Sequence, residues 1–77
     1  MVSTNPSQYQ LAIKWLVNQR HLCGVTQAEL SKRLGKHQSF VSKYENGERR
    51  LDIAEIIEIC KALRIDPHEL VNSLTGE

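Results

Sequence analysis

The side chains best suited to chemistry in this chain are hydrogen-bonding groups at helical spacing between residues 38 and 43. They are Gln38, Ser39, Ser42 and Lys43. Residues four apart share one helix face, so the four form one outward patch if Val41 and Tyr44 face inward. A glutamine amide can pair with adenine, a serine hydroxyl with either purine, and a lysine with guanine or a phosphate. A plain solvent-exposed helix face shows the same residue types.

Residues on both sides of this patch are suited to holding phosphate groups. The candidates are Gln27, Lys36, His37, Asn46, Arg49 and Arg50. Gln27 stands at the start of a predicted helix, where free backbone amides and its side chain can grip one phosphate together. Phosphate contacts fix the register of a protein on a duplex, and base contacts specify the sequence. The arrangement therefore predicts a site that reads double-stranded DNA.

The charge distribution agrees with such a site, although the net charge of +1 does not argue for it. Residues 32–50 contain six basic and two acidic side chains, a net charge of +4. Residues 52–77 contain two basic and six acidic side chains, a net charge of −4. A basic segment becomes a nucleic-acid signal only where it shares a surface with residues that read bases.

The elements that must position these residues are five helices, predicted at 6–22, 26–34, 37–45, 52–63 and 66–74. Their expected starts are Asn5 with Pro6 and Gln8, Thr26 with Glu29, Asp52 with Glu55, and Asp66 with Pro67 and Glu69. These pairs follow the spacing of capping boxes, or place proline at the first helical position. The four glycines fall where the helices end. No segment alternates like a strand, so the predicted class is all-α.

Apolar residues recur on one face of each predicted helix. The expected inner positions are Ile13, Leu16, Cys23, Ala28, Leu30, Leu34, Phe40, Val41, Tyr44, Ile53, Ile56, Ile57, Cys60, Leu63, Leu70 and Leu74. Only Gly35 and Lys36 separate the second helix from the third, so the two are expected to pack as a rigid helix-turn-helix pair. Cys23 and Cys60 are interpreted as buried hydrophobic residues rather than as a disulfide.

The length and composition exclude several classes of protein. The chain has 77 residues, enough for one small domain. It contains no apolar run of about 20 residues that would span a bilayer, and its start lacks the pattern of a signal peptide. The histidines and cysteines do not show the spacing of a metal site, and neither a catalytic constellation nor a phosphate-cradling glycine loop is evident. We therefore expect no cofactor, no metal and no enzymatic activity.

The run TQAELSKRLGKHQSFVSKYENGERR, residues 26–50, resembles the helix-turn-helix core of the Cro and phage-repressor type of transcriptional regulators. The likeness continues through KALRIDPHEL and covers about 65 residues. It implies a compact five-helix, lambda-repressor-like domain, here residues 6–75 after a short N-terminal arm of residues 1–5. The resemblance also implies that Gln27 binds phosphate and braces the recognition helix, and that Arg20 pairs with Glu45.

Three positions depart from the family pattern. His37 stands where serine or threonine usually caps the recognition helix, so this helix start is expected to be weak. Phe40 replaces a polar residue, and either packs beside Tyr44 or touches a thymine methyl group. Arg64 replaces a glycine, so the fourth helix either ends differently or carries strain of about 1 kcal/mol.

Together these features predict a homodimeric, sequence-specific regulator, a repressor that reads an inverted repeat in the major groove. Leu70, Val71 and Leu74 are expected to leave an apolar edge for a second copy. We expect the protein to be encoded by a bacterium or a phage. Its expected location is the bacterial cytoplasm, in association with the nucleoid. The alternative is a protein-interaction module such as an antitoxin, which would keep the fold but bind a protein.

Overall fold

A computed structural model of the chain describes residues 6–76 and contains five helices, with no strand in that range. The helices are α1 (Gln8–Leu22), α2 (Gln27–Arg33), α3 (Phe40–Glu45), α4 (Ile53–Leu63) and α5 (Pro67–Thr75). The predicted all-α class is thus confirmed. The expected arm of residues 1–5 lies outside the described residues.

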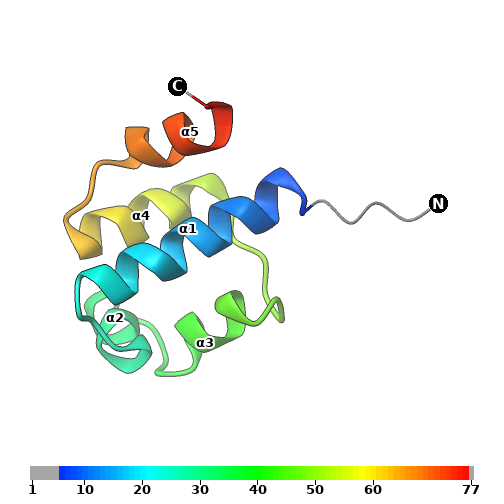
Figure 1. The fold of residues 1–77 in the computed structure, drawn as a ribbon. Helices are drawn as coiled ribbons and strands as arrows, with labels where there is room; N and C mark the ends of the chain where they lie inside the picture. Colours follow the sequence, from blue (N-terminus) through cyan, green and yellow to red (C-terminus); the bar gives the residue numbers. More distant parts are fainter. Residues whose placement is uncertain (1–5, 77) are drawn as a thin grey trace.

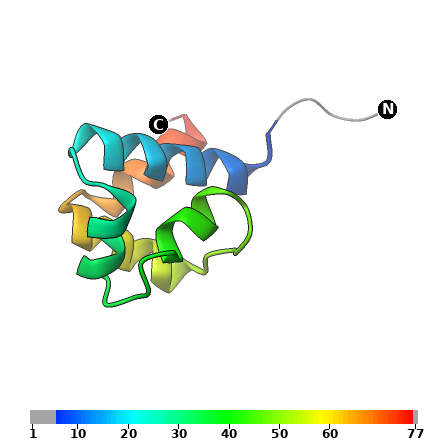
Figure 2. The same cartoon turned by 90° about the horizontal axis from the view of Figure 1, so that it is seen from below.

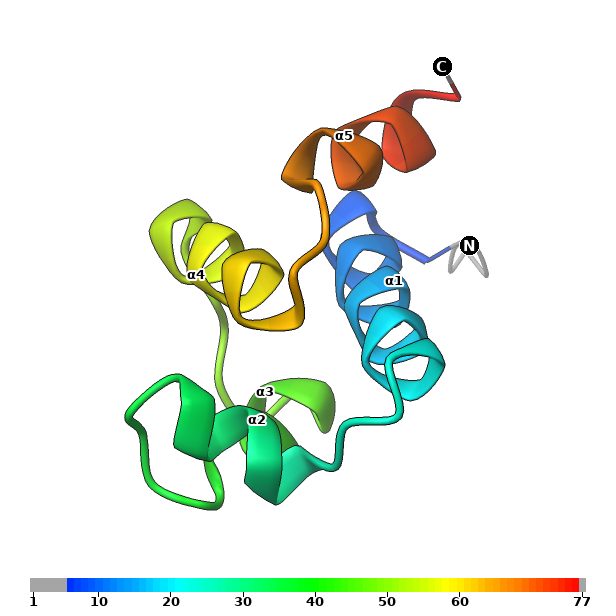
Figure 3. The same cartoon turned by 90° about the vertical axis from the view of Figure 1, so that its left-hand side faces the viewer.

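The two short helices α2 and α3 lie together at one end of the molecule, and α5 lies at the opposite end (Figure 1). Between them, α1 packs against α3, α4 and α5, while α4 also contacts α2. Figure 3 shows the same order from the side. Figure 2 views the molecule from below, so that α2 and α3 lie towards the viewer and α5 lies behind. The helix-turn-helix pair therefore forms one face that α1 and α4 support directly, while α5 packs against those two helices at the opposite end.

The core lies where these helices meet, around seven side chains that are almost fully buried. They are Leu16, Leu30, Ser31, Val41, Tyr44, Ile59 and Cys60. Burial also raises the pKa of the Cys60 thiol, so this cysteine stays protonated as a small hydrophobic residue. It is not disulfide-bonded to Cys23.

Several predicted core positions were wrong. Cys23 is exposed because it is the C-cap of α1, beyond the last turn that packs on the core, and Ala28 is exposed as well. Ile53 is 70% exposed because it begins α4, outside the packed turns. The buried stripe of that helix contains Ile59, which the sequence analysis did not select, instead of the exposed Ile57.

The starts of α2, α4 and α5 use the predicted capping residues, whereas α1 and α3 begin later than predicted. Asp52 and Glu55 form the full capping box, and Thr26 accepts from the amide of Glu29 at 3.1 Å. The carboxylate of Glu29 contacts Arg33 instead of completing its box. Asp66 caps α5 by accepting from the amide of His68, with Pro67 at the first helical position.

The first helix begins later than predicted. Ser7, rather than Asn5, is its N-cap, and Ser7 and Gln10 form a reciprocal capping box. Asn5 lies outside the described residues, and Pro6 precedes the helix. The serine and glutamine satisfy two free amides at once, and Ser7 itself is extended as an N-cap residue usually is.

The fourth helix ends on Arg64 in the left-handed conformation, at φ 59° and ψ 43°. The amide of Ile65 donates to the carbonyl of Cys60 at 2.9 Å, so the helix closes as it would with glycine. The expected strain at Arg64 is therefore present, since a side chain disfavours this conformation.

Candidate nucleic-acid interface

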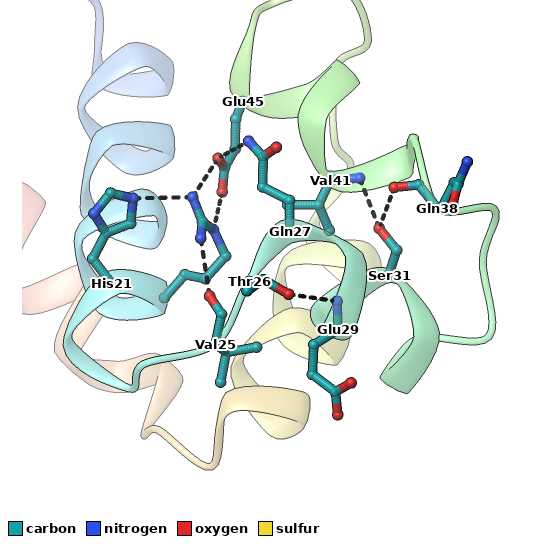
Figure 4. A network of polar contacts seen from close by, with 10 residues as sticks. His21, Val25, Thr26, Gln27, Glu29, Ser31, Gln38, Val41 and Glu45 are labelled. Carbon is teal, nitrogen blue, oxygen red and sulfur yellow. Dashed lines mark hydrogen bonds and ion pairs between the residues drawn. The ribbon is translucent and has the colours of Figure 1, made fainter.

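A buried ion pair joins α1 to the end of α3. Nε of Arg20 donates to one carboxylate oxygen of Glu45 at 2.8 Å, and Nη2 donates to the other at 3.0 Å. Nη1 of Arg20 donates to the carbonyl of Val25 at 2.9 Å, so the same guanidinium holds the turn before α2 (Figure 4). The hydrogen bond to Glu45 raises the pKa of Arg20. One side chain thus connects three segments around the helix-turn-helix pair.

Gln27 is attached to the same carboxylate. Its side-chain nitrogen donates to Glu45 at 2.8 Å, which links the start of α2 to the end of α3 (Figure 4). The amide has a second N–H and a carbonyl oxygen, and the side chain is half-buried. The structure thus places Gln27 as a brace of the recognition helix. Its contact with a DNA phosphate stays a prediction.

Ser31 ties the turn between the two helices to α2, a role the sequence analysis missed. Its hydroxyl donates to the carbonyl of Gln38 at 3.3 Å and accepts from the amide of Val41 at 3.2 Å. Ser31 is fully buried, so its hydrogen bonds replace those lost to water. The sequence signal that could have indicated this role is a small hydroxyl residue, Ser31, directly after Leu30, which was expected on the inner face of the same helix.

The recognition helix begins differently from the prediction. Regular α-helix starts at Phe40 rather than near His37, and Ser39 makes no side-chain cap. A tight turn precedes it, in which the amide of Phe40 donates to the carbonyl of His37 at 2.9 Å. Nδ1 of His37 accepts from the amide of Ser39 at 3.2 Å. The imidazole of His37 therefore accepts from a backbone amide as a serine cap would. The acceptor serves the turn before α3, and the regular helix begins only at Phe40.

This turn changes the geometry of the predicted base-reading patch. Gln38 and Ser39 lie on the turn before α3, while Ser42 and Lys43 lie on the helix itself. Gln38 and Lys43 are exposed, and the side chain of Gln38 points away from the polar network (Figure 4). The hydroxyl of Ser42 donates to the carbonyl of Ser39 at 2.9 Å, and both serines are half-buried. Gln38 and Lys43 are the more accessible members of the patch.

The remaining predicted phosphate residues are all exposed. They are Lys36, His37, Asn46, Arg49 and Arg50. A shallow cavity of about 330 Å³ brings some of them together with the patch, and its lining comprises Lys36, His37, Ser39, Phe40, Lys43 and Arg49. Three cationic side chains thus line one surface depression beside the recognition helix. Arg49 is already paired with Glu55, so Lys36 and Lys43 are the two that suit a negatively charged ligand.

Phe40 forms the apolar part of this depression. Its ring meets that of Tyr44 edge to face, with centroids 5.7 Å apart and planes at 68°. The guanidinium of Arg49 lies 4.9 Å from the Phe40 centroid, and the ammonium of Lys36 lies 5.7 Å from it. Of the two alternatives for Phe40, the structure contains the packing against Tyr44.

The connection between α2 and α3 spans residues 34–39, so it is longer than the predicted Gly35-Lys36 link because the helix starts later. A buried brace, two short helices packed through this connection and a basic polar face define a helix-turn-helix DNA-binding domain. The helix-turn-helix family matches residues 16–70 of the chain. A solved structure described as an XRE-family like protein from Pseudomonas syringae pv. tomato strain DC3000 is 45% identical, with a TM-score of 0.85. The match covers 90% of this chain and 84% of that one. A comparison with curated proteins gives no match.

The chain therefore belongs to the Cro and phage-repressor type of helix-turn-helix regulators, as its sequence predicted. The family and the structure together make it a lambda-repressor-like DNA-binding domain. Between residues 6 and 76, no helix is long and apolar enough to cross a membrane. The same residues contain no cluster of three histidine, cysteine or acidic side chains placed to hold a metal ion.

Proposed function

We propose that this protein is a sequence-specific repressor that reads an inverted-repeat operator in the major groove through Gln38 and its neighbours. The observation that carries the proposal is the placement of Gln38. Its carbonyl is held by the buried Ser31, while its side chain is exposed beside a helix anchored by Glu45. A fixed backbone with a free amide side chain is the arrangement that direct base reading needs.

The proposed roles divide between reading and gripping. Gln38 and Lys43 contact base edges most directly, with Ser39 and Ser42 shaping the edge of the same surface. Gln27, Lys36, His37, Asn46 and Arg50 hold the DNA backbone. Exposed side chains before and after residues 38–43 in the sequence support this division, because backbone contacts on two sides define the register of a protein on a duplex.

Selection from random duplexes with the purified protein tests the proposal. Enrichment of an inverted repeat supports it. Gln38→Ala should cost about 1–3 kcal/mol of specific binding and relax preference at one base pair. Asn18→Ala, at an exposed amide on α1 in the groove towards α5, is the matched control and should leave preference unchanged.

The salt dependence of affinity separates this proposal from the protein-binding alternative. Each phosphate neutralised contributes about 0.9 to the slope of log affinity against log salt on B-DNA, so a steep negative slope is expected. If the purified protein enriches no sequence and its weak DNA binding hardly responds to salt, the proposal is wrong and a protein partner is favoured.

A further inference from the structure

Arg49 and Arg50 are neighbours in the sequence but have different surroundings. Arg49 makes a bidentate ion pair with Glu55 on α4, at 2.6 and 3.1 Å, and Nη1 also donates to the carbonyl of Arg50 at 2.9 Å. Its hydrogen bond to Glu55 lowers the pKa of that carboxyl. Arg50 is exposed and makes no ion pair with the described residues. Arg49 is therefore engaged within the fold, and Arg50 is available.

Arg50 lies instead over an aromatic ring from another helix. The carbon of its guanidinium is 3.9 Å from the ring centroid of Tyr9, in the first turn of α1. A guanidinium that stacks through its face keeps its N–H groups directed outward in its plane. The stacked arginine can thus donate to a phosphate without leaving the ring.

Tyr9 also fixes the backbone that carries Arg50. Its hydroxyl accepts from the amide of Leu51 at 3.0 Å, and the side chain of Leu51 is buried in the core. The ring contact and the hydrogen bond act on consecutive residues of the loop between α3 and α4. One side chain from α1 thus holds both the backbone and the charged group at this point.

We propose that Tyr9 is a positioning residue for DNA binding, which holds Arg50 as the phosphate-contacting arginine of the loop while Arg49 serves the fold. The inference rests on the proposed function, because it explains how Arg50 is positioned to contact the DNA backbone. Fixing a long side chain before binding avoids part of the ordering cost that binding otherwise carries.

A double-mutant cycle in DNA affinity tests this role with Tyr9→Leu, Arg50→Ala and the combination, using one selected operator duplex. Each single change should weaken binding by about three- to tenfold, the range for one immobilised side chain. The combination should bind as Arg50→Ala does, because the ring acts only through the arginine. Effects that multiply in the combination would overturn the proposal.

Two further variants separate positioning from general loosening of the loop. Tyr9→Phe keeps the ring and removes only the hydroxyl, so it should bind within about twofold of the wild type if stacking is the main effect. Arg50→Ala should lower the salt slope by about one unit. Arg49→Ala should change that slope less and lower the free energy of unfolding more, because Arg49 is held by Glu55.

A measurement on the wild type keeps the inference testable if Tyr9→Leu fails to fold. Side-chain protons of Arg50 that lie over the ring should resonate upfield in the NMR spectrum, both free and bound to DNA. Random-coil positions in the free protein would overturn the stacking, and with it the inference. A wild-type protein that binds no duplex would overturn the proposed function as well, whereas tight binding with additive variants overturns only the role of Tyr9.

Discussion

Glu45 is the side chain on which the orientation of the recognition helix depends most directly. Its carboxylate accepts three hydrogen bonds, two from Arg20 and one from Gln27. Both charged side chains of the pair are less than a tenth exposed. Burial makes such a pair costly to form, and removing one partner strands the other charge in the interior.

Replacing Glu45 with glutamine should therefore destabilise the domain strongly. Glu45→Gln keeps the shape but leaves the buried Arg20 without a counter-charge, so we expect a loss of about 3–5 kcal/mol in the free energy of unfolding. A domain of this size has about 4–12 kcal/mol in total. Urea denaturation followed by circular dichroism measures the change.

Glu29→Gln provides the matched control for this prediction. Glu29 pairs with Arg33 at 3.4 Å, but both side chains are 40% or more exposed. Surface pairs of this kind contribute less than about 1 kcal/mol. Equal losses in the two variants would show that Glu45 has no special role.

Single residues also show what sequence can and cannot predict. The capping pair Asp52 and Glu55 was predictable because both partners lie within one turn. The bonds of Ser31 to the Gln38 carbonyl and of Tyr9 to the Leu51 amide were not, since each joins segments that only the folded chain brings together. Resemblance to a family supplied Arg20 and Glu45, which lie 25 residues apart.

At the scale of the element, the sequence located every helix but misjudged the start of the most functional one. The spacing of Val41 and Tyr44 gave the inner face of α3 correctly. Its start was predicted near His37, whereas the chain makes a tight turn there and becomes regular at Phe40. The tight turn at this position depends on the imidazole of His37 accepting a backbone hydrogen bond. Capping preferences derived from serine and aspartate do not describe that contact.

At the end of α4, one substitution is expected to stabilise the domain, whereas most substitutions lower the free energy of unfolding. Arg64→Gly should stabilise the domain, because glycine adopts the observed left-handed conformation without a clash. Part of this gain is offset by the greater freedom of glycine in the unfolded chain. We expect a net gain of about 0.5–1 kcal/mol, or roughly 3–6 °C in Tm, by thermal denaturation.

Lys61→Gly is the control within the same helix. Lys61 is exposed and lies in the helical last turn of α4, where glycine costs about 1 kcal/mol. The two glycine substitutions should therefore shift Tm in opposite directions. A fall in Tm for both would mean that the Arg64 side chain contributes contacts that outweigh its backbone strain.

At the scale of the whole molecule, the dimensions suit a pair of copies on one duplex. The domain measures 40 × 27 × 22 Å. Recognition helices that read successive major grooves on one side of DNA lie about 34 Å apart. Only the longest dimension exceeds this spacing, so two copies touch on one duplex when their long axes lie along it, as the expected homodimer requires.

The expected apolar edge for this contact is narrower than the sequence analysis indicated. Leu70 is buried in the core and Leu74 is half-buried, whereas Val71 is 55% exposed. Leu70 packs inward because the core-facing side of α5 contacts α1 and α4. Val71 is thus the member of the expected edge that is free to contact a second copy.

Val71→Lys should then weaken dimerisation while leaving the fold intact, because an exposed position tolerates charge in the monomer but not inside an apolar contact. Sedimentation should show the wild type as a dimer on the operator and the variant shifted towards monomer. Affinity for the full inverted repeat should fall, while affinity for a single half-site stays unchanged. Leu22→Lys, at a 72% exposed position at the end of α1, should alter neither measurement. A wild-type protein that sediments as a monomer both free and on operator DNA would show that this domain reads its site singly.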